Sequence, residues 1–275
     1  MGHTTLVTAL TLATGLAAAS MASAASLKIT ITNTASIGGF SLTPVYSAAH
    51  DGSFDAFDVG DDASAGVELI AELGDPGGLP VERLADDPNS TATVIAAPAN
   101  GVGTIDPGET TTAFLHLTEP SQRFFTFLSM LVPSNDTFLG NDDALEIIDA
   151  AGNYLGDQTI ILTGLDLYDA GTEANDLNDG AAFVALVDGA SPSVPATGGT
   201  VTSDKIQLAS TLDFGLNNAI TTPVGLLDPA LTDFMSDPSG FGVARIEIAA
   251  VPLPAAAPML AGALILMGAL RRRRG

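Results

Sequence analysis

The chain has 275 residues, contains no cysteine and carries a formal net charge of −23 at pH 7. The absence of cysteine excludes disulfides and thiol chemistry, so the stability of the fold must come from a hydrophobic core. All 32 acidic residues lie between Asp51 and Glu247, and residues 25–250 keep only five of the nine cations, which leaves this part with a formal charge of −27. We expect no nucleic-acid partner, because phosphate binding requires a basic face.

Residues 1–24 are predicted to be a secretory signal peptide. An apolar stretch of mostly small residues runs from Leu6 to Ala19, and Ala22-Ser23-Ala24 fits the small-x-small pattern at which such peptides are cleaved. No Lys or Arg precedes Lys28, so the positive charge that usually begins a signal peptide can come only from the amino terminus and His3. The simplest interpretation is export.

Residues 25–250 are predicted to form one β-rich domain, and their number suffices for a single sizeable core. The segment Leu27 to Thr32 alternates apolar and polar residues, as a half-buried strand does. Similar segments are separated by Gly, Pro, Asn and Asp clusters that favour turns. They are Phe40 to Tyr46, Thr91 to Ala97, Thr111 to Leu117, Phe124 to Val132, Thr159 to Leu167, Ala181 to Val187, Lys205 to Ala209 and Val243 to Ala250.

This pattern predicts an all-β fold, an antiparallel β-sandwich, because the strands are numerous and no helices alternate with them. One helix is expected from Ser64 to Leu73, with Ser64 as the N-cap residue and an apolar stripe that includes Val67 and Ile70. A second short turn is expected over Val81 to Leu84. Both helices would then lie in loops of the sandwich.

Four motifs follow one another along this domain. They are His50 to Gly60 (HDGSFDAFDVG), the helix at Ala65 to Gly74, Met130 to Gly140 (MLVPSNDTFLG) and Asp166 to Glu173 (DLYDAGTE). With these motifs in this order, the chain resembles bacterial spondin N-terminal domains over roughly residues 27–250. The resemblance implies a C2-like β-sandwich found in matrix and adhesion proteins, with a divalent cation, usually Ca²⁺, bound near one edge.

Asp136 and Asp169 match the family's metal ligands, so the resemblance implies the same role for both. Calcium takes six to eight oxygen ligands, typically from loops. If the strands Phe124 to Val132 and Thr159 to Leu167 lie close together, both carboxylates reach one pole of the sandwich. Animal members of the family have a third carboxylate; here Leu117 occupies that position, and Glu119 is the nearest acid. The alternative is that Asp136 and Asp169 cap turns by accepting hydrogen bonds from backbone N–H groups.

Other chemistry has weaker support in the sequence. His50, Asp51 and Ser53 are sequence neighbours and do not define a catalytic triad, which is a matter of geometry. A second calcium loop could use acids and amides that lack EF-hand spacing: Asp142, Asp143, Glu173, Asn175, Asp176 and Asp179. No hydrolase, metalloprotease or phosphate-loop motif is present, so we expect no enzymatic activity.

Residues 251–275 are predicted to be a sorting segment. Val251-Pro-Leu-Pro-Ala-Ala256 precedes a short apolar stretch and then Arg271 to Arg274. The prolines leave a secure helix only from about Pro258, which is short for a membrane span. The segment resembles the VPLPA variant of the PEP-CTERM signal. That resemblance implies transient anchoring in the inner membrane and recognition by an exosortase-type protease, whereas an ordinary membrane anchor is the alternative.

Together these features predict an exported, non-enzymatic, calcium-binding adhesion or matrix module at a bacterial cell surface. Its expected partner is an extracellular polysaccharide or a surface protein. One alternative is a C2-like module that binds lipid or anionic polysaccharide through a bridging calcium. Another is a hydrolase of matrix polysaccharides, which would require paired carboxylates in a cleft.

Overall fold

The computed structural model describes residues 26–97, 103–175, 185–186, 199–209, 220–222, 225–228 and 231–251. The predicted signal peptide and nearly all of the predicted sorting segment lie outside these residues, as does most of the strand expected at Ala181 to Val187. Within the described part of the chain, no helix is long and apolar enough to cross a membrane.

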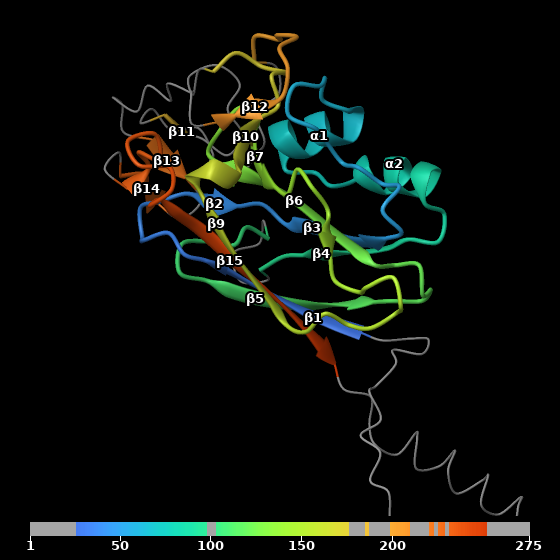
Figure 1. The fold of residues 1–275 in the computed structure, drawn as a ribbon. Helices are drawn as coiled ribbons and strands as arrows, with labels where there is room; N and C mark the ends of the chain where they lie inside the picture. The colour runs from blue at the N-terminus through green and yellow to red at the C-terminus, as the bar shows by residue number, and fades with distance from the viewer. Residues whose placement is uncertain are drawn as a thin grey trace, which may run out of the picture.

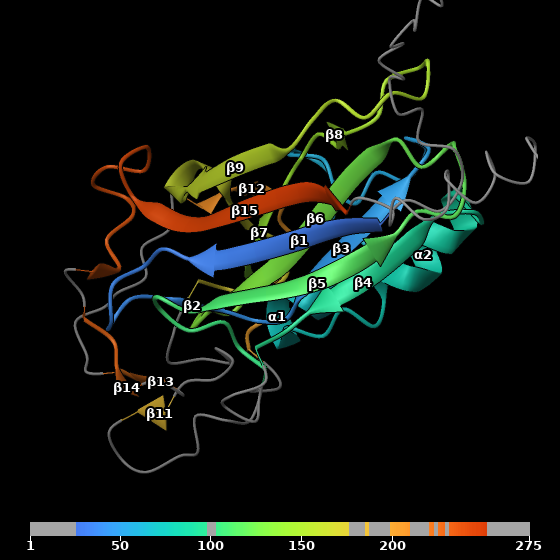
Figure 2. The ribbon, with the colours of Figure 1, turned by 90° about the horizontal axis from the view of Figure 1, so that it is seen from below.

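A four-stranded antiparallel sheet contains both ends of the described chain. Its order is β5 (Thr110–His116), β1 (Ser26–Asn33), β15 (Gly242–Val251) and β9 (Gln158–Thr163) (Figure 2). Ser26 lies opposite Val251 in this sheet, so both chain ends leave from the same end of the molecule. The alternation expected of the first strand is present, because Leu27, Ile29 and Ile31 are fully buried.

The larger sheet has the order β12 (Gln207–Leu208), β10 (Leu167–Asp169), β7 (Thr137–Gly140), β6 (Phe124–Val132), β3 (Val45–His50) and β4 (Thr91–Ile95). The short strands β2 (Ser41–Leu42) and β8 (Leu145–Glu146) also pair with β6. A separate small sheet is formed by β11 (Ala185–Leu186), β13 (Ile220–Thr222) and β14 (Gly225–Leu226). The two large antiparallel sheets confirm the predicted all-β sandwich.

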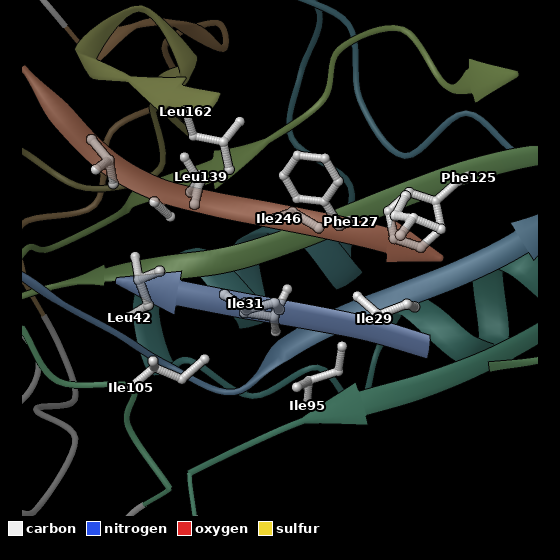
Figure 3. Close-up of a cluster of buried hydrophobic side chains, with 14 of the residues drawn as sticks. Ile29, Ile31, Leu42, Ile95, Ile105, Phe125, Phe127, Leu139, Leu162 and Ile246 are labelled. Carbon is white, nitrogen blue, oxygen red and sulfur yellow. The ribbon is translucent and has the colours of Figure 1, made fainter. Parts of the chain in front are cut away.

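The strand β6 is buried on both faces, which explains its nearly continuous apolar sequence. Phe125 and Phe127 point between the two sheets and pack with side chains of the four-stranded sheet, among them Ile29 and Ile246 (Figure 3). Leu128 points to the opposite face and belongs to a second buried cluster. A strand covered on both sides reads as one apolar run, whereas a half-buried strand alternates.

Two helices cover the outer face of the larger sheet, so the molecule has three layers (Figure 1). They are α1 (Ala65–Leu73) and α2 (Leu79–Asp86). Ser64 caps α1 as predicted, accepting a hydrogen bond from Val67 N. Glu82 of α2 accepts hydrogen bonds from Gly66 N at 2.7 Å and Ser64 Oγ at 2.8 Å, which joins the two helices. The second helix is therefore longer than the predicted turn, because it packs on the sheet as well as connecting strands.

Two predicted strands are divided in the structure. The segment Phe40 to Tyr46 contains β2 and the start of β3, with Thr43-Pro44 between them. The segment Thr159 to Leu167 contains all of β9 except its first residue, then a 3-10 turn (η1, Gly164–Asp166) and the first residue of β10. The chain passes from one sheet to the other at this turn.

Candidate metal site

Asp136 and Asp169 lie side by side at one edge of the larger sheet. Asp136 directly precedes β7 and Asp169 is the last residue of β10, and these strands pair with Thr137 opposite Asp169. Ala170 N also donates a hydrogen bond to the backbone carbonyl of Asp136 at 3.1 Å. The two acids are thus brought together as expected. However, the contact comes from β7 and β10, because the strand β9 belongs to the other sheet.

Asp136 is fully buried, and its two carboxylate oxygens have different surroundings. Oδ2 accepts hydrogen bonds from Thr172 N at 2.9 Å, Glu173 N at 3.0 Å and Thr172 Oγ1 at 3.3 Å. Oδ1 is also buried but has no hydrogen-bond partner among the described residues. A buried carboxylate oxygen without a partner is costly, which points to a proton or a cation at this atom.

The environment of Asp136 favours its neutral form in the absence of a cation. Burial is the main cause that raises its pKa from 3.8 to about 7, and the neighbouring Asp169 carboxylate adds to the rise. The hydrogen bonds from Glu173 and Thr172 oppose it but are weaker. A divalent cation beside Oδ1 would reverse this balance by stabilising the ionised carboxylate.

Asp169 is 1% exposed, and both of its oxygens accept hydrogen bonds. Gly171 N donates to Oδ1 at 2.6 Å and Asn175 Nδ2 donates to Oδ2 at 2.8 Å. Burial raises the pKa of Asp169 as well, and the nearby Asp204 carboxylate contributes to the rise. Gly171 has φ of +71°, and a Cβ on it would lie 2.6 Å from the carbonyl oxygen of Asp204. The turn after Asp169 therefore requires glycine.

The chemistry of these oxygens fits a hard cation. Calcium binds carboxylate, carbonyl and water oxygens, and each carboxylate oxygen can accept more than one contact. Among the described residues, no group of three or more His, Cys, Asp or Glu side chains is arranged to hold a metal ion. Asp136 and Asp169 would therefore be the two carboxylate ligands, and neutral oxygens would complete the coordination.

The Spondin_N family matches residues 36–194, which is more than half of the chain and includes both acids. The chain belongs to the Spondin_N family. No curated protein matches it. Family membership indicates an extracellular domain of a generally non-enzymatic kind. The match is shorter than the predicted resemblance, and it excludes β1 and β15, although these strands form the centre of the four-stranded sheet.

Glu119 does not join Asp136 and Asp169 in this Spondin_N domain. It precedes β6, whereas Asp136 follows the other end of this nine-residue strand. At about 3.3 Å per residue, the strand separates them by roughly 30 Å. Leu117, at the position of the third family carboxylate, lies on the Glu119 side and is buried in the core between the sheets. The expected third ligand is therefore not at this site.

Two of the residues expected in a second calcium loop, Glu173 and Asn175, instead lie beside the Asp136–Asp169 pair, whereas Asp142 and Asp143 follow the other end of β7 and Asp176 and Asp179 lie outside the described residues. Asn175 binds Asp169, and the backbone of Glu173 binds Asp136. The carboxylate of Glu173 accepts a hydrogen bond from Gly199 N at 2.9 Å. Their place within ten residues after Asp166 is the sequence signal that could have linked them to Asp169. Asp204, by contrast, lies far along the chain, and no sequence spacing indicated it.

The residues His50, Asp51 and Ser53 do not form a catalytic arrangement. His50 is buried, with Nε2 2.9 Å from Thr126 Oγ1, while Nδ1 accepts a hydrogen bond from Gly52 N at 3.2 Å. The Ser53 hydroxyl donates to Asp51 Oδ1 at 2.6 Å. Both nitrogens of His50 are therefore engaged in contacts that fix β3 and the turn that follows it.

Proposed function

We propose that this Spondin_N domain is an exported, non-enzymatic, calcium-binding module of a bacterial cell surface or extracellular matrix. The observation that carries the calcium proposal is Oδ1 of Asp136, a fully buried carboxylate oxygen without a partner among the described residues. Asp169 supplies the second carboxylate. Thr172 and Glu173 hold the other oxygen of Asp136 and so fix the direction of Oδ1.

The position of these acids supports a role in contacting a partner. Figure 1 shows β7 and β10 at the end of the molecule opposite to the end of β15, where residue 251 leads into the predicted sorting segment. A protein attached through that segment would present the Asp136–Asp169 edge away from its attachment. Calcium there would order the loop at residues 170–175, and the surface that this loop helps to form would contact an extracellular polysaccharide or a surface protein.

Calcium titration by calorimetry tests the site in the full chain. We expect saturable binding that is lost, or weakened at least tenfold, in Asp136→Ala and Asp169→Ala, because each removes one of two carboxylate ligands. Glu119→Ala is the matched control, since it removes the same charge from the opposite end of β6. Unchanged affinity in both aspartate variants would disprove the assignment.

Sorting through residues 251–275 is the second part of the proposal. The four arginines after a short apolar stretch support retention of that end on the cytoplasmic side. Deleting Arg271 to Arg274 is expected to change both the mature mass and the cellular fraction in which the protein is found. Mass spectrometry of fractionated cells measures both, and an unchanged mass and location would argue against an exosortase-type protease as a partner.

A further inference from the structure

The strand β15 lies in the middle of the four-stranded sheet and is paired on both sides (Figure 2). Its ten residues span roughly 30 Å. The strand β1 lies opposite Ala244 to Val251, and β9 lies opposite Gly242 to Ile248. Just before β9, the Asp157 carboxylate accepts a hydrogen bond from Ala250 N at 3.4 Å. Thus β15 is held from both sides almost to the residue at which it leaves the sheet.

The order of the elements along the chain determines how a force would cross the domain. Asp136, Asp169, β1 and β9 all precede β15, whereas the predicted sorting segment follows β15 directly. The covalent connection from Asp169 to β15 runs through residues 170–241, which could extend to about 240 Å and are therefore slack in the folded protein. A force between the Asp136–Asp169 edge and the sorting segment thus does not run along this connection. It passes from β1 and β9 into β15, across the hydrogen bonds and core contacts that join these strands.

The direction of this force loads the hydrogen bonds of β15 in shear. Hydrogen bonds between antiparallel strands are perpendicular to the strands. A pull on Val251 toward the sorting segment acts along β15, while β1 is held from its other end, where Asn33 lies opposite Ala244. Such a pull loads all of these bonds together. A pull that separates Ser26 from Val251 would instead break the pairs one at a time, because these two residues lie opposite each other at the same end.

Core side chains of β15 add to the resistance against sliding. Ala244, Ile246 and Ile248 are buried between the two sheets, and Figure 3 shows Ile246 beside Phe127 of β6. Protein cores are closely packed, so a strand cannot move along its axis without forcing its inward side chains past fixed neighbours. Shear of β15 therefore requires the backbone hydrogen bonds and the packing of these side chains to fail in the same event.

We propose that β15 is the strand through which this domain transmits tension between its sorting segment and a partner held at the Asp136–Asp169 edge, and that it resists this tension in shear. The proposal rests on the attachment and the contact edge proposed above, because these two points define the direction of the force. The weak direction, between Ser26 and Val251, carries no load once the predicted signal peptide is removed. The domain then stays folded while a surface and a bound partner are pulled apart.

Single-molecule pulling between introduced cysteines tests the direction of resistance, because the natural chain has no cysteine. Two variants of the full chain both carry Pro252→Cys. Adding Ile37→Cys places the second handle on an 88% exposed residue beyond the Asn33 end of β1, so the pull shears β1 against β15. Adding Ala25→Cys places it next to Ser26, so the pull unzips the same two strands. At one pulling rate, we expect the first pair to need a rupture force roughly twofold higher or more.

Equal rupture forces in the two directions, or a lower force in the shear direction, would overturn the proposal. A matched pair of truncations separates local resistance from overall stability. Ile246 and Ile95 are each 1% exposed in the same core, but only Ile246 lies on β15. We expect Ile246→Ala and Ile95→Ala both to lower the free energy of unfolding in denaturant, and only Ile246→Ala to lower the shear force markedly.

An equal fall in the shear force in both truncations would show that the resistance reflects overall stability, and would also contradict the proposal. The pulling measurements need neither calcium nor a membrane. Their failure would therefore leave the calcium site and the sorting segment untouched. An unchanged location after deletion of Arg271 to Arg274 would instead remove the attachment that supplies the load, although the two rupture forces would still differ.

Discussion

Asp136→Asn is expected to stabilise the calcium-free protein by roughly 4 kcal/mol at pH 8 and to change its stability little at pH 4. Burial, aided by the Asp169 carboxylate, raises the pKa of Asp136 to about 7 in the folded protein. The folded state therefore binds more protons than the unfolded state between about pH 4 and pH 7. The free energy of unfolding of the natural protein therefore falls as the pH rises through this window. Asparagine mimics the neutral acid, so the Asp136→Asn variant does not lose this stability.

The geometry allows asparagine to fit. Its amide oxygen can accept the hydrogen bonds from Thr172 N and Glu173 N, while its uncharged NH₂ group takes the place of Oδ1, whose negative charge the Asp169 carboxylate disfavours. Urea unfolding at pH 4, 6 and 8 in a chelator measures the effect, with Glu119→Gln as an exposed control of equal charge change. Adding calcium should stabilise the natural protein and leave Asp136→Asn unaffected. An Asp136→Asn variant less stable than the natural protein at pH 8 without calcium would show that Asp136 serves chiefly as an ionised turn cap.

Phe127→Ala is expected to lower the free energy of unfolding by about 3 to 5 kcal/mol. Phe127 is fully buried between the two sheets, with its ring centre 6.0 Å from that of Phe125, so its truncation leaves a cavity in the core that joins the sheets. Phe114→Ala is the matched control, because Phe114 is 51% exposed on the outer face of β5. Its removal should cost less than about 1 kcal/mol.

Denaturant unfolding of both phenylalanine variants compares the two sites directly. Equal losses of stability would contradict a core formed between the two sheets, because only one of the two rings fills that space. The same pair also checks that β5 presents alternate side chains to solvent, as its register with β1 requires.

The sequence predicted the long strands well because the order of apolar and polar residues in each strand follows the burial of its two faces. The alternation in β1 corresponds to one buried and one exposed face, and the apolar run in β6 corresponds to burial on both. The passage from β9 to β10 could not be predicted, since Thr159 to Leu167 reads as one apolar segment. It depends on Gly164, where a Cβ would lie 3.0 Å from Pro238, a residue more than 70 positions away.

The site was predictable only in part for a similar reason. Asp136 and Asp169 were identified from two local motifs, and the structure places both beside the β7–β10 pair. The strand β7, which begins four positions after Pro133, was not predicted, because a strand of only four residues shows too little periodicity to be recognised. The separation of Glu119 from Asp136 follows from the predicted strand Phe124 to Val132, which lies between them. The nearness of Asp204 to Asp169 depends on a contact between residues 171 and 204, which no local pattern indicates.

Anomalous diffraction from crystals grown with calcium, or with terbium in its place, tests the central claim most directly. We expect a single strong peak at 2.3–2.6 Å from Asp136 Oδ1 for calcium, with an oxygen of Asp169 in the same coordination sphere. The peak should disappear in Asp136→Asn crystals. A natural protein that shows no peak at Asp136, or whose calcium lies only at other acids such as Asp142 and Asp143, would contradict the account.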